Sequence, residues 1–135
     1  MRAIHRRESG FSLIEMLVVL TLVSILAGIA TLTLGDSSSR AYVTTMQSDL
    51  RNLQTAQEAY IEQTFAETGT ATYASNVSDL KLTLSNGVQI RMRGNATGWA
   101  ARATHQRVPG ARCALYRGSA RPFLPATDEG KIACD

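Results

Sequence analysis

One carboxylate, that of Glu15, lies near the start of a long apolar run, where a charged group could do chemistry. The run covers residues 11–34 and holds no other charged residue. A carboxylate placed in hydrocarbon costs about 2.5–3.5 kcal/mol on insertion scales, so a functional partner is expected for it. We expect Glu15 to meet a positive charge on a neighbouring copy of the chain when these apolar segments bundle together.

The two cysteines of the chain, Cys113 and Cys134, both lie near its C-terminal end. In an exported chain, two late cysteines most simply form one disulfide that closes the last segment. A bond across a loop of this length contributes about 3 kcal/mol in the chain-entropy model. The alternative is two independent thiols. No CxxC pair or neighbouring histidine accompanies the cysteines, so no metal site is expected.

Eight basic residues and no acidic residue lie within residues 81–121, and aromatic residues occur among them. Basic groups interleaved with aromatic ones can follow a nucleic-acid backbone. The candidate nucleic-acid contacts are Arg91, Arg93 and Arg102.

Two structural explanations for these arginines compete with nucleic-acid binding, and we favour them over it. Arginines that alternate along strands form the solvated face of a half-buried sheet. They could also pair with acids of a helix, such as Glu58 and Glu62, within one chain or between chains.

No nucleophile, base and orienting group can be assembled around His105, which is expected at the surface of a strand. The chain is therefore predicted to have no enzymatic activity, no cofactor and no metal.

The apolar run is expected to be a membrane-length helix behind a basic leader, residues 1–10. As a helix, residues 11–34 would extend about 36 Å at 1.5 Å per residue, more than the hydrocarbon core of about 30 Å. Basic residues that precede such a helix remain on the cytoplasmic side, so the rest of the chain is expected outside.

The helix is expected to continue as an amphipathic second half over residues 35–66, with Gly35 as the place for a kink. Apolar residues recur there at steps of three and four, which is typical of a helix with one buried face. The residues of this apolar stripe are Val43, Met46, Leu50, Leu53, Ala56 and Tyr60.

Residues 67–135 are expected to form a small antiparallel β domain that ends in a disulfide loop. Alternating apolar and polar residues predict strands over residues 80–84, 88–93, 99–105 and 112–117, joined by turns at 85–87, 94–98 and 108–110. The predicted fold class is α+β, with a long N-terminal helix packed on the small sheet.

The start of the apolar run closely resembles the N-terminal signature of type IV pilins and of type II secretion pseudopilins. The residues that carry the resemblance are Gly10-Phe11-Ser12-Leu13-Ile14-Glu15-Met16-Leu17-Val18-Val19-Leu20. The resemblance is tight over about residues 6–34 and loose beyond them. It implies a pilin-like fold, cleavage between Gly10 and Phe11 by a prepilin peptidase, N-methylation of Phe11, and a role for Glu15 in subunit assembly.

The same resemblance implies where the protein acts and with which partners. The precursor would be a single-pass protein of the inner membrane with a cytoplasmic N-terminus, handled by an inner-membrane assembly machinery. The mature chain would form a homo-oligomeric filament at the cell surface or in the periplasm. The amine freed at Phe11 could be neutralised by Glu15 of a neighbour, because either charge alone is costly in apolar surroundings.

Several alternatives remain open at this point. The filament could be a type IV pilus, the pseudopilus of a type II secretion system, or a DNA-binding pilus of the competence type. An ordinary secretory signal could instead end at Gly28-Ile29-Ala30, although the apolar run is longer than the usual 7–15 residues of such a signal. An anchor that is never processed would leave Gly10 and Glu15 unexplained.

Overall fold

The structure, a computed structural model, describes residues 11–135, without the side chains of residues 29–37. It divides into two compact units, Met1–Ser37 and Ser38–Asp135, which are described separately. Helix α1, Leu13–Thr68, contributes residues to both units. The predicted leader, residues 1–10, lies outside the described residues, and the predicted domain bounds stay a prediction.

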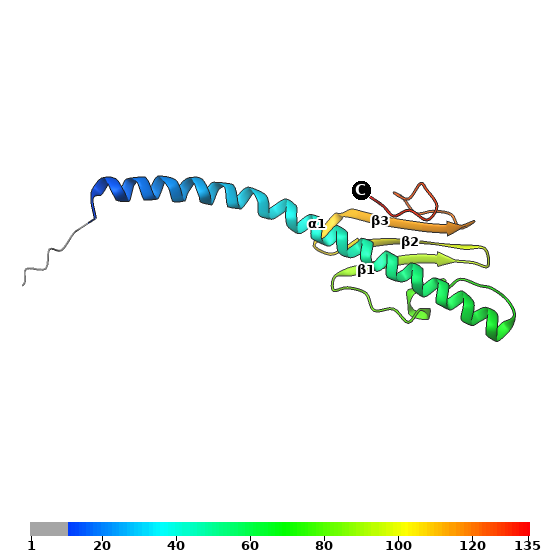
Figure 1. Cartoon of the computed structure of the whole chain (residues 1–135). Helices are drawn as coiled ribbons and strands as arrows, with labels where there is room; N and C mark the ends of the chain where they lie inside the picture. The colour runs from blue at the N-terminus through cyan, green and yellow to red at the C-terminus, as the bar shows by residue number, and fades with distance from the viewer. Residues whose placement is uncertain (1–10) are drawn as a thin grey trace, which may run out of the picture. The chain divides into compact units, whose positions relative to one another are not determined.

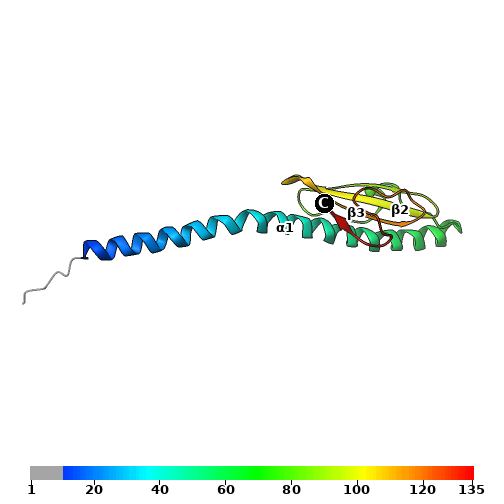
Figure 2. The same ribbon diagram turned by 90° about the horizontal axis from the view of Figure 1, so that it is seen from above.

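The second unit packs part of α1 against one face of a four-stranded antiparallel sheet (Figures 1 and 2). The strands lie in the order β1-β2-β3-β4, and a short 3₁₀ helix, η1, precedes them. Their bounds are Val77–Asp79 for η1, Val88–Gly94 for β1, Gly98–His105 for β2, Val108–Gly118 for β3 and Ala133–Cys134 for β4. The predicted α+β class, a helix on a small antiparallel sheet, is confirmed.

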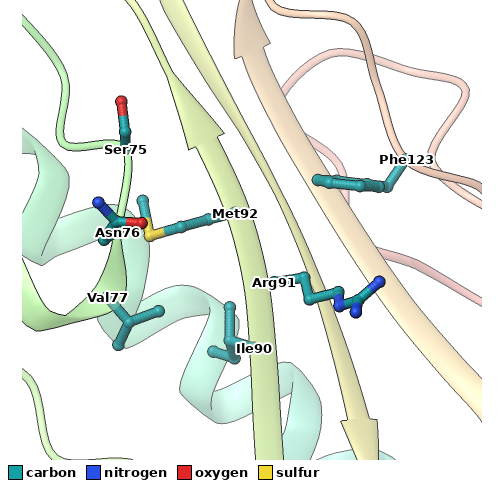
Figure 3. Close-up of a pocket in the computed structure, with 7 residues that line it drawn as sticks. All are labelled: Ser75, Asn76, Val77, Ile90, Arg91, Met92 and Phe123. Atoms are coloured by element: carbon teal, nitrogen blue, oxygen red, sulfur yellow. The ribbon is translucent and has the colours of Figure 1, made fainter.

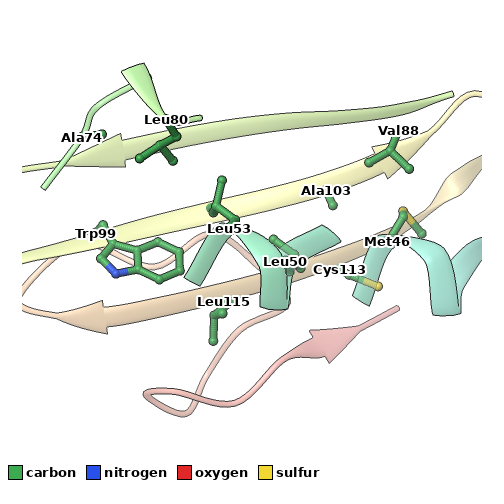
Figure 4. Close-up of a cluster of buried hydrophobic side chains, with 11 residues drawn as sticks. Met46, Leu50, Leu53, Ala74, Leu80, Val88, Trp99, Ala103, Cys113 and Leu115 are labelled. Atoms are coloured by element: carbon green, nitrogen blue, oxygen red, sulfur yellow. The ribbon is translucent and has the colours of Figure 1, made fainter. Parts of the chain in front are cut away.

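The core of this unit lies between α1 and the sheet (Figure 4). Met46, Leu50 and Leu53 follow one another at steps of four and three along α1, and all three are fully buried. They pack in one cluster with Trp99 of β2 and Leu115 of β3. The amphipathic pattern thus selects the buried face of the helix, because residues at this spacing share one side of it.

The first predicted strand, residues 80–84, is wrong: this segment is not in the sheet. Its backbone bonds are local, with the amide of Leu80 donating to Val77 O (3.1 Å) and that of Leu82 to Leu80 O (2.8 Å). Both leucines nevertheless pack on the core. The alternating pattern therefore reflects burial of every second side chain, which does not require a paired strand.

The turn predicted at residues 108–110 is also misplaced. The turn lies at Gln106 and Arg107, and Val108 already pairs with His105 as the first residue of β3. The next register pair joins Thr104 to Arg112, so residues 109–111 have no partner on β2. This irregularity accommodates a proline and a glycine within the strand, because an unpaired residue needs no ladder hydrogen bond.

Candidate functional site

The carboxylate of Glu15 lies at the N-terminus of α1 and bonds to its own helix end. The backbone amide of Ser12, the residue before the helix, donates to Glu15 Oε2 at 3.0 Å. This bond is the glutamate half of a capping box, in which a glutamate three residues after the N-cap serine accepts from the serine's own backbone amide. The spacing of Ser12 and Glu15 is a signal for this bond that is visible in the sequence.

The surface of α1 that follows Glu15 is apolar on all sides. Phe11 is 79% exposed and Leu13 is 83% exposed. The large apolar side chains between Ile14 and Leu26 are exposed to between 48% and 68%. Residues that point in every direction around a helix cannot all be covered by one sheet, so this surface is suited to lipid or to a bundle of helices.

Two hydroxyl groups within this apolar surface bond back to the helix. Thr21 Oγ1 donates to Val18 O at 2.8 Å, and Ser24 Oγ donates to Leu20 O at 2.7 Å. Such bonds remove the need for an outside partner when a helix enters an apolar environment.

The transmembrane helix expected over residues 11–34 is not found in the described part of the chain. No helix among the described residues combines the length and the hydropathy of a membrane span. Gly10, the residue before the expected cleavage site, and the side chains of residues 29–34 lie outside what the structure describes.

The three candidate arginines meet on the sheet face that points away from α1. Arg91 of β1 is directly opposite Arg102 of β2, and Arg93 is opposite Ala100. Their neighbours on β1, Ile90 and Met92, pack on the core instead, as expected when successive side chains alternate between the two faces. Arg91 and Arg93 are exposed, and Arg102 is half-buried.

An aromatic ring from the C-terminal tail covers part of this arginine cluster. The guanidinium carbon of Arg93 lies 3.8 Å from the centroid of the Phe123 ring, and that of Arg102 lies 5.5 Å from it. Both distances are within the range of a cation–π interaction. Arg102 Nε is buried without a hydrogen-bond partner. Arg93 and Arg102 thus pack against the Phe123 ring, and among the described residues no ion pair of the structure joins them to a carboxylate.

Pairing of these arginines with helix acids of the same chain is not observed. Within residues 11–135, the ion pairs of the structure join Arg112 to Asp135 at 2.6 Å and Lys131 to Asp128 at 3.5 Å. Glu58 instead accepts a hydrogen bond from Gln54 Nε2 at 3.3 Å.

A hollow of about 430 Å³ lies beside β1 at the edge of the sheet (Figure 3). Arg91 is the one charged residue of its lining, and the other lining residues are Ser75, Asn76, Val77, Ile90, Met92 and Phe123. This lining holds no carboxylate, imidazole or thiol.

Three polar residues of this unit, not predicted from the sequence as buried, lie in its interior. Asp49, 2% exposed, accepts bonds from the amide and the hydroxyl of Ser85, both at 2.9 Å. Gln57, fully buried, donates to Ala74 O at 2.9 Å and accepts from Ala74 N at 3.0 Å. These bonds attach the loop between α1 and β1 to the helix.

His105 is the third buried polar residue, which corrects the expectation of a surface position. It is 5% exposed, and its ring stacks on that of Tyr42 with 4.3 Å between the centroids. Its Nε2 lies 3.2 Å from Asn86 O, and its Nδ1 accepts a bond from the amide of Arg107 at 3.1 Å. His105 follows the buried Ala101 and Ala103 at every second position of β2, so its ring lies on the core side of the strand, where both nitrogens have partners.

The structure joins Cys113 to Cys134 in a disulfide that ties the C-terminal tail to β3. The two residues are also opposite each other in the β3–β4 ladder. Arg112 and Asp135 exchange two backbone bonds beside it, at 3.1 and 3.0 Å. The tail that carries Phe123 is therefore held at its far end by covalent and hydrogen bonds.

Comparison with known protein families identifies the N-terminal segment. Residues 5–31 match a family model described as the prokaryotic N-terminal methylation motif. This motif describes structural subunits and not an enzyme family. No match is found among curated proteins or among solved structures. The chain thus carries, over residues 5–31, the N-terminal signal of type IV pilins and pseudopilins, and the motif supports a subunit of this kind.

Proposed function

We propose that this protein is a structural subunit of a type IV pilus-like filament. It is made as a precursor, cleaved by a prepilin peptidase after Gly10 and N-methylated at Phe11. The observation that carries the proposal is the methylation motif at residues 5–31, which leads into a helix whose apolar side chains are exposed on all sides. Such a surface needs covering, and a bundle of identical helices covers it without leaving an apolar patch in water.

The precursor is proposed to be anchored in the inner membrane, with its N-terminus in the cytoplasm. Inner-membrane assembly machinery would transfer it into a filament at the cell surface or in the periplasm. Support comes from the methylation motif and from the exposed apolar residues of the first unit. Fractionation of cells that express the full chain tests this step, and a precursor found only in the soluble fraction would contradict it.

In the filament, Glu15 is proposed to neutralise the methylated amine of a neighbouring Phe11. A carboxylate has several acceptor sites, so its bond to the amide of Ser12 is compatible with a second partner. The amine is a cation at the end of an apolar helix, and burying it unpaired would cost several kcal/mol. The pair would set the register between subunits.

The capping box offers a competing role for Glu15, and two substitutions separate the two roles. Glu15→Gln keeps an acceptor for the Ser12 amide but removes the negative charge. If the charge neutralises an amine, the yield of sheared filaments falls by about tenfold or more, because the amine stays unpaired. If Glu15 only caps the helix, Glu15→Gln assembles normally.

The matched control for this experiment is Glu67→Gln. Glu67 is an exposed helical acid that also accepts a local bond, from Gln63 at 2.8 Å. The Glu67→Gln variant should assemble like the parent chain.

Mass spectrometry of the mature protein tests the processing itself: N-methylated Phe11 is expected, whereas Thr31 as first residue would indicate an ordinary secretory signal.

The subunit of a type II secretion pseudopilus is the alternative with the same chemistry at Gly10, Phe11 and Glu15. Imaging of surface filaments, with the subunit identified by peptide mapping, separates the two.

A DNA-binding pilus of the competence type is a further alternative that rests on Arg91, Arg93 and Arg102. Binding of duplex DNA to the full chain, titrated with salt, tests it, since phosphate contacts make affinity fall steeply as salt rises.

A further inference from the structure

The sheet face opposite α1 carries an uncompensated positive charge. We call Arg91, Arg93 and Arg102, with Phe123 over them, the arginine face. Arg91 and Arg102 are directly opposite each other in the β1–β2 ladder, although like charges in that position repel. In the described part of the chain, no ion pair of the structure involves them. A cluster of this kind is costly in the isolated subunit, and a carboxylate partner would relieve it.

The outer side of α1 in the same unit carries the opposite charge. We call Glu58, Glu62 and Phe65 the acidic ridge. These residues lie at steps of four and three, so they share one side of the helix, turned away from the buried Leu53 and Gln57. Both glutamates are exposed, and Phe65 is 60% exposed. The nearest basic residue on this side is Arg51, two turns before Glu58.

The spacing of the charges on the two surfaces matches. Glu58 and Glu62, one helical turn apart, are separated by about 6 Å along the axis at 1.5 Å per residue. Arg91 and Arg93, two residues apart on one strand, are separated by about 6.6 Å at 3.3 Å per residue. Each surface also offers an exposed apolar group, Phe65 on the ridge and Leu124, 71% exposed, in the tail beside Phe123.

We infer that the arginine face of one copy of this chain docks on the acidic ridge of a second copy. The two surfaces lie on opposite layers of the same unit, the sheet face away from α1 and the helix side away from the sheet. Each copy can therefore offer both surfaces at once. Contacts of this heterologous kind repeat without closing unless the rotation forms a ring, so they generate filaments. The inference deepens the proposed filament function and rests on it.

Charge complementarity selects a second copy over nucleic acid as the occupant. Arg91 and Arg93 lie at the spacing of the two acids, and Arg93 and Arg102 are already in cation–π contact with the Phe123 ring. A ring that already contacts two guanidinium groups offers less surface for stacking on a base, which single-stranded nucleic acid would need. A carboxylate from the acidic ridge of the second copy, placed above Arg91 and Arg102, offsets the repulsion between these two arginines.

Charge reversal in the full chain, expressed in cells that assemble it, tests the inference. Arg91→Glu with Arg93→Glu, and separately Glu58→Arg with Glu62→Arg, are each expected to lower the filament yield by about tenfold, equivalent to about 1.4 kcal/mol per contact. The four substitutions combined restore opposite charges and should return the yield to within about twofold of the parent chain.

The matched control is Lys81→Glu with Arg107→Glu. Both residues are exposed and lie in the same basic stretch, but outside the arginine face. This variant has the same net charge as the first reversal and should assemble normally. A loss of filaments in the control as large as in Arg91→Glu with Arg93→Glu would overturn the inference, since net charge alone would then explain the effect.

A cross-link provides a second readout that does not depend on filament yield. In the Arg91→Lys, Arg93→Lys variant, a carbodiimide should join position 91 or 93 to Glu58 or Glu62 of another copy, as a dimer on a denaturing gel with the joined peptides mapped by mass spectrometry. Absence of that joined peptide overturns the inference.

The remaining outcomes are decisive as well. A four-site combination that stays as defective as the double variants overturns the inference, and loss of duplex DNA binding in the arginine variant alone would then assign this face to nucleic acid. The proposed processing is read from a different signal, the mass of the mature N-terminus. A chain that still begins at Met1 would contradict the processing while leaving the cross-link result to stand by itself.

Discussion

At the scale of single residues, buried polar side chains organise the second unit. Asp49 is the most constrained of them, because its two oxygens accept the amide and the hydroxyl of one residue, Ser85. Both bonds reach from α1 to the loop that leads into β1. A carboxylate this deeply buried is stable only if its acceptors are satisfied, so the loop and the acid depend on each other.

Replacing Asp49 by alanine is expected to lower the free energy of unfolding by about 2–3 kcal/mol, because the Ser85 amide loses a charged acceptor. The measurement is denaturant unfolding of the full chain in detergent, followed by the fluorescence of Trp99, the one tryptophan, which is 1% exposed. Asp79→Ala is the control, since Asp79 is exposed and should change the stability by less than about 0.5 kcal/mol. Equal effects of the two substitutions would contradict the role given to Asp49.

At the scale of elements, the packing of the loop before η1 on the end of β1 depends on one glycine. A Cβ placed on Gly94 would collide with the backbone carbonyl of Ala74. That same carbonyl accepts the side-chain bond of Gln57, so it cannot shift without breaking a second contact. Close approach of two backbones is a general reason for glycine in a strand.

Gly94→Ala should therefore destabilise the protein by about 1–3 kcal/mol, the usual cost of forced overpacking. Gly110→Ala is the matched control within the same sheet, because a Cβ at Gly110 would meet nothing within 4 Å. The two variants are compared by thermal unfolding monitored by circular dichroism. A Gly94→Ala protein as stable as Gly110→Ala would show that Ala74 can move.

At the scale of the whole molecule, the covalent link between Cys113 and Cys134 closes the C-terminal segment onto β3. The two cysteines are 21 residues apart in the sequence. The tail between them supplies Phe123 to the arginine face. The amide of Gly130, in the same tail, donates to the carbonyl oxygen of Tyr116 in β3 at 2.9 Å. Stability and the proposed interface are thus linked through one segment.

Substituting both cysteines by serine is expected to lower the free energy of unfolding by about 3 kcal/mol, since the unfolded chain regains the entropy of the open loop. Denaturant unfolding of the parent chain with and without a reductant should reproduce the difference. The double serine variant itself should not respond to the reductant. A reductant effect of similar size in that variant would contradict the assignment of the loss to the disulfide.

The N-terminal motif and the amphipathic stripe could be interpreted from the sequence because both are local. Gly10, Phe11 and Glu15 stand within one short segment, and this segment lies within residues 5–31, which match the methylation motif. Met46, Leu50 and Leu53 repeat with the period of a helix, so their shared burial follows from the backbone geometry alone.

The tertiary structure decided what depends on partners distant in the sequence. Leu80 and Leu82 alternate like strand residues, but whether they pair depends on ladder bonds to a neighbouring strand, and here their backbone amides donate to local carbonyls instead. The burial of Asp49, Gln57 and His105 likewise requires partners that lie 17 to 36 residues away. The meeting of Arg91 with Arg102, under a ring from the tail, follows from strand register, which is fixed by turns and bulges and not by the composition of either strand.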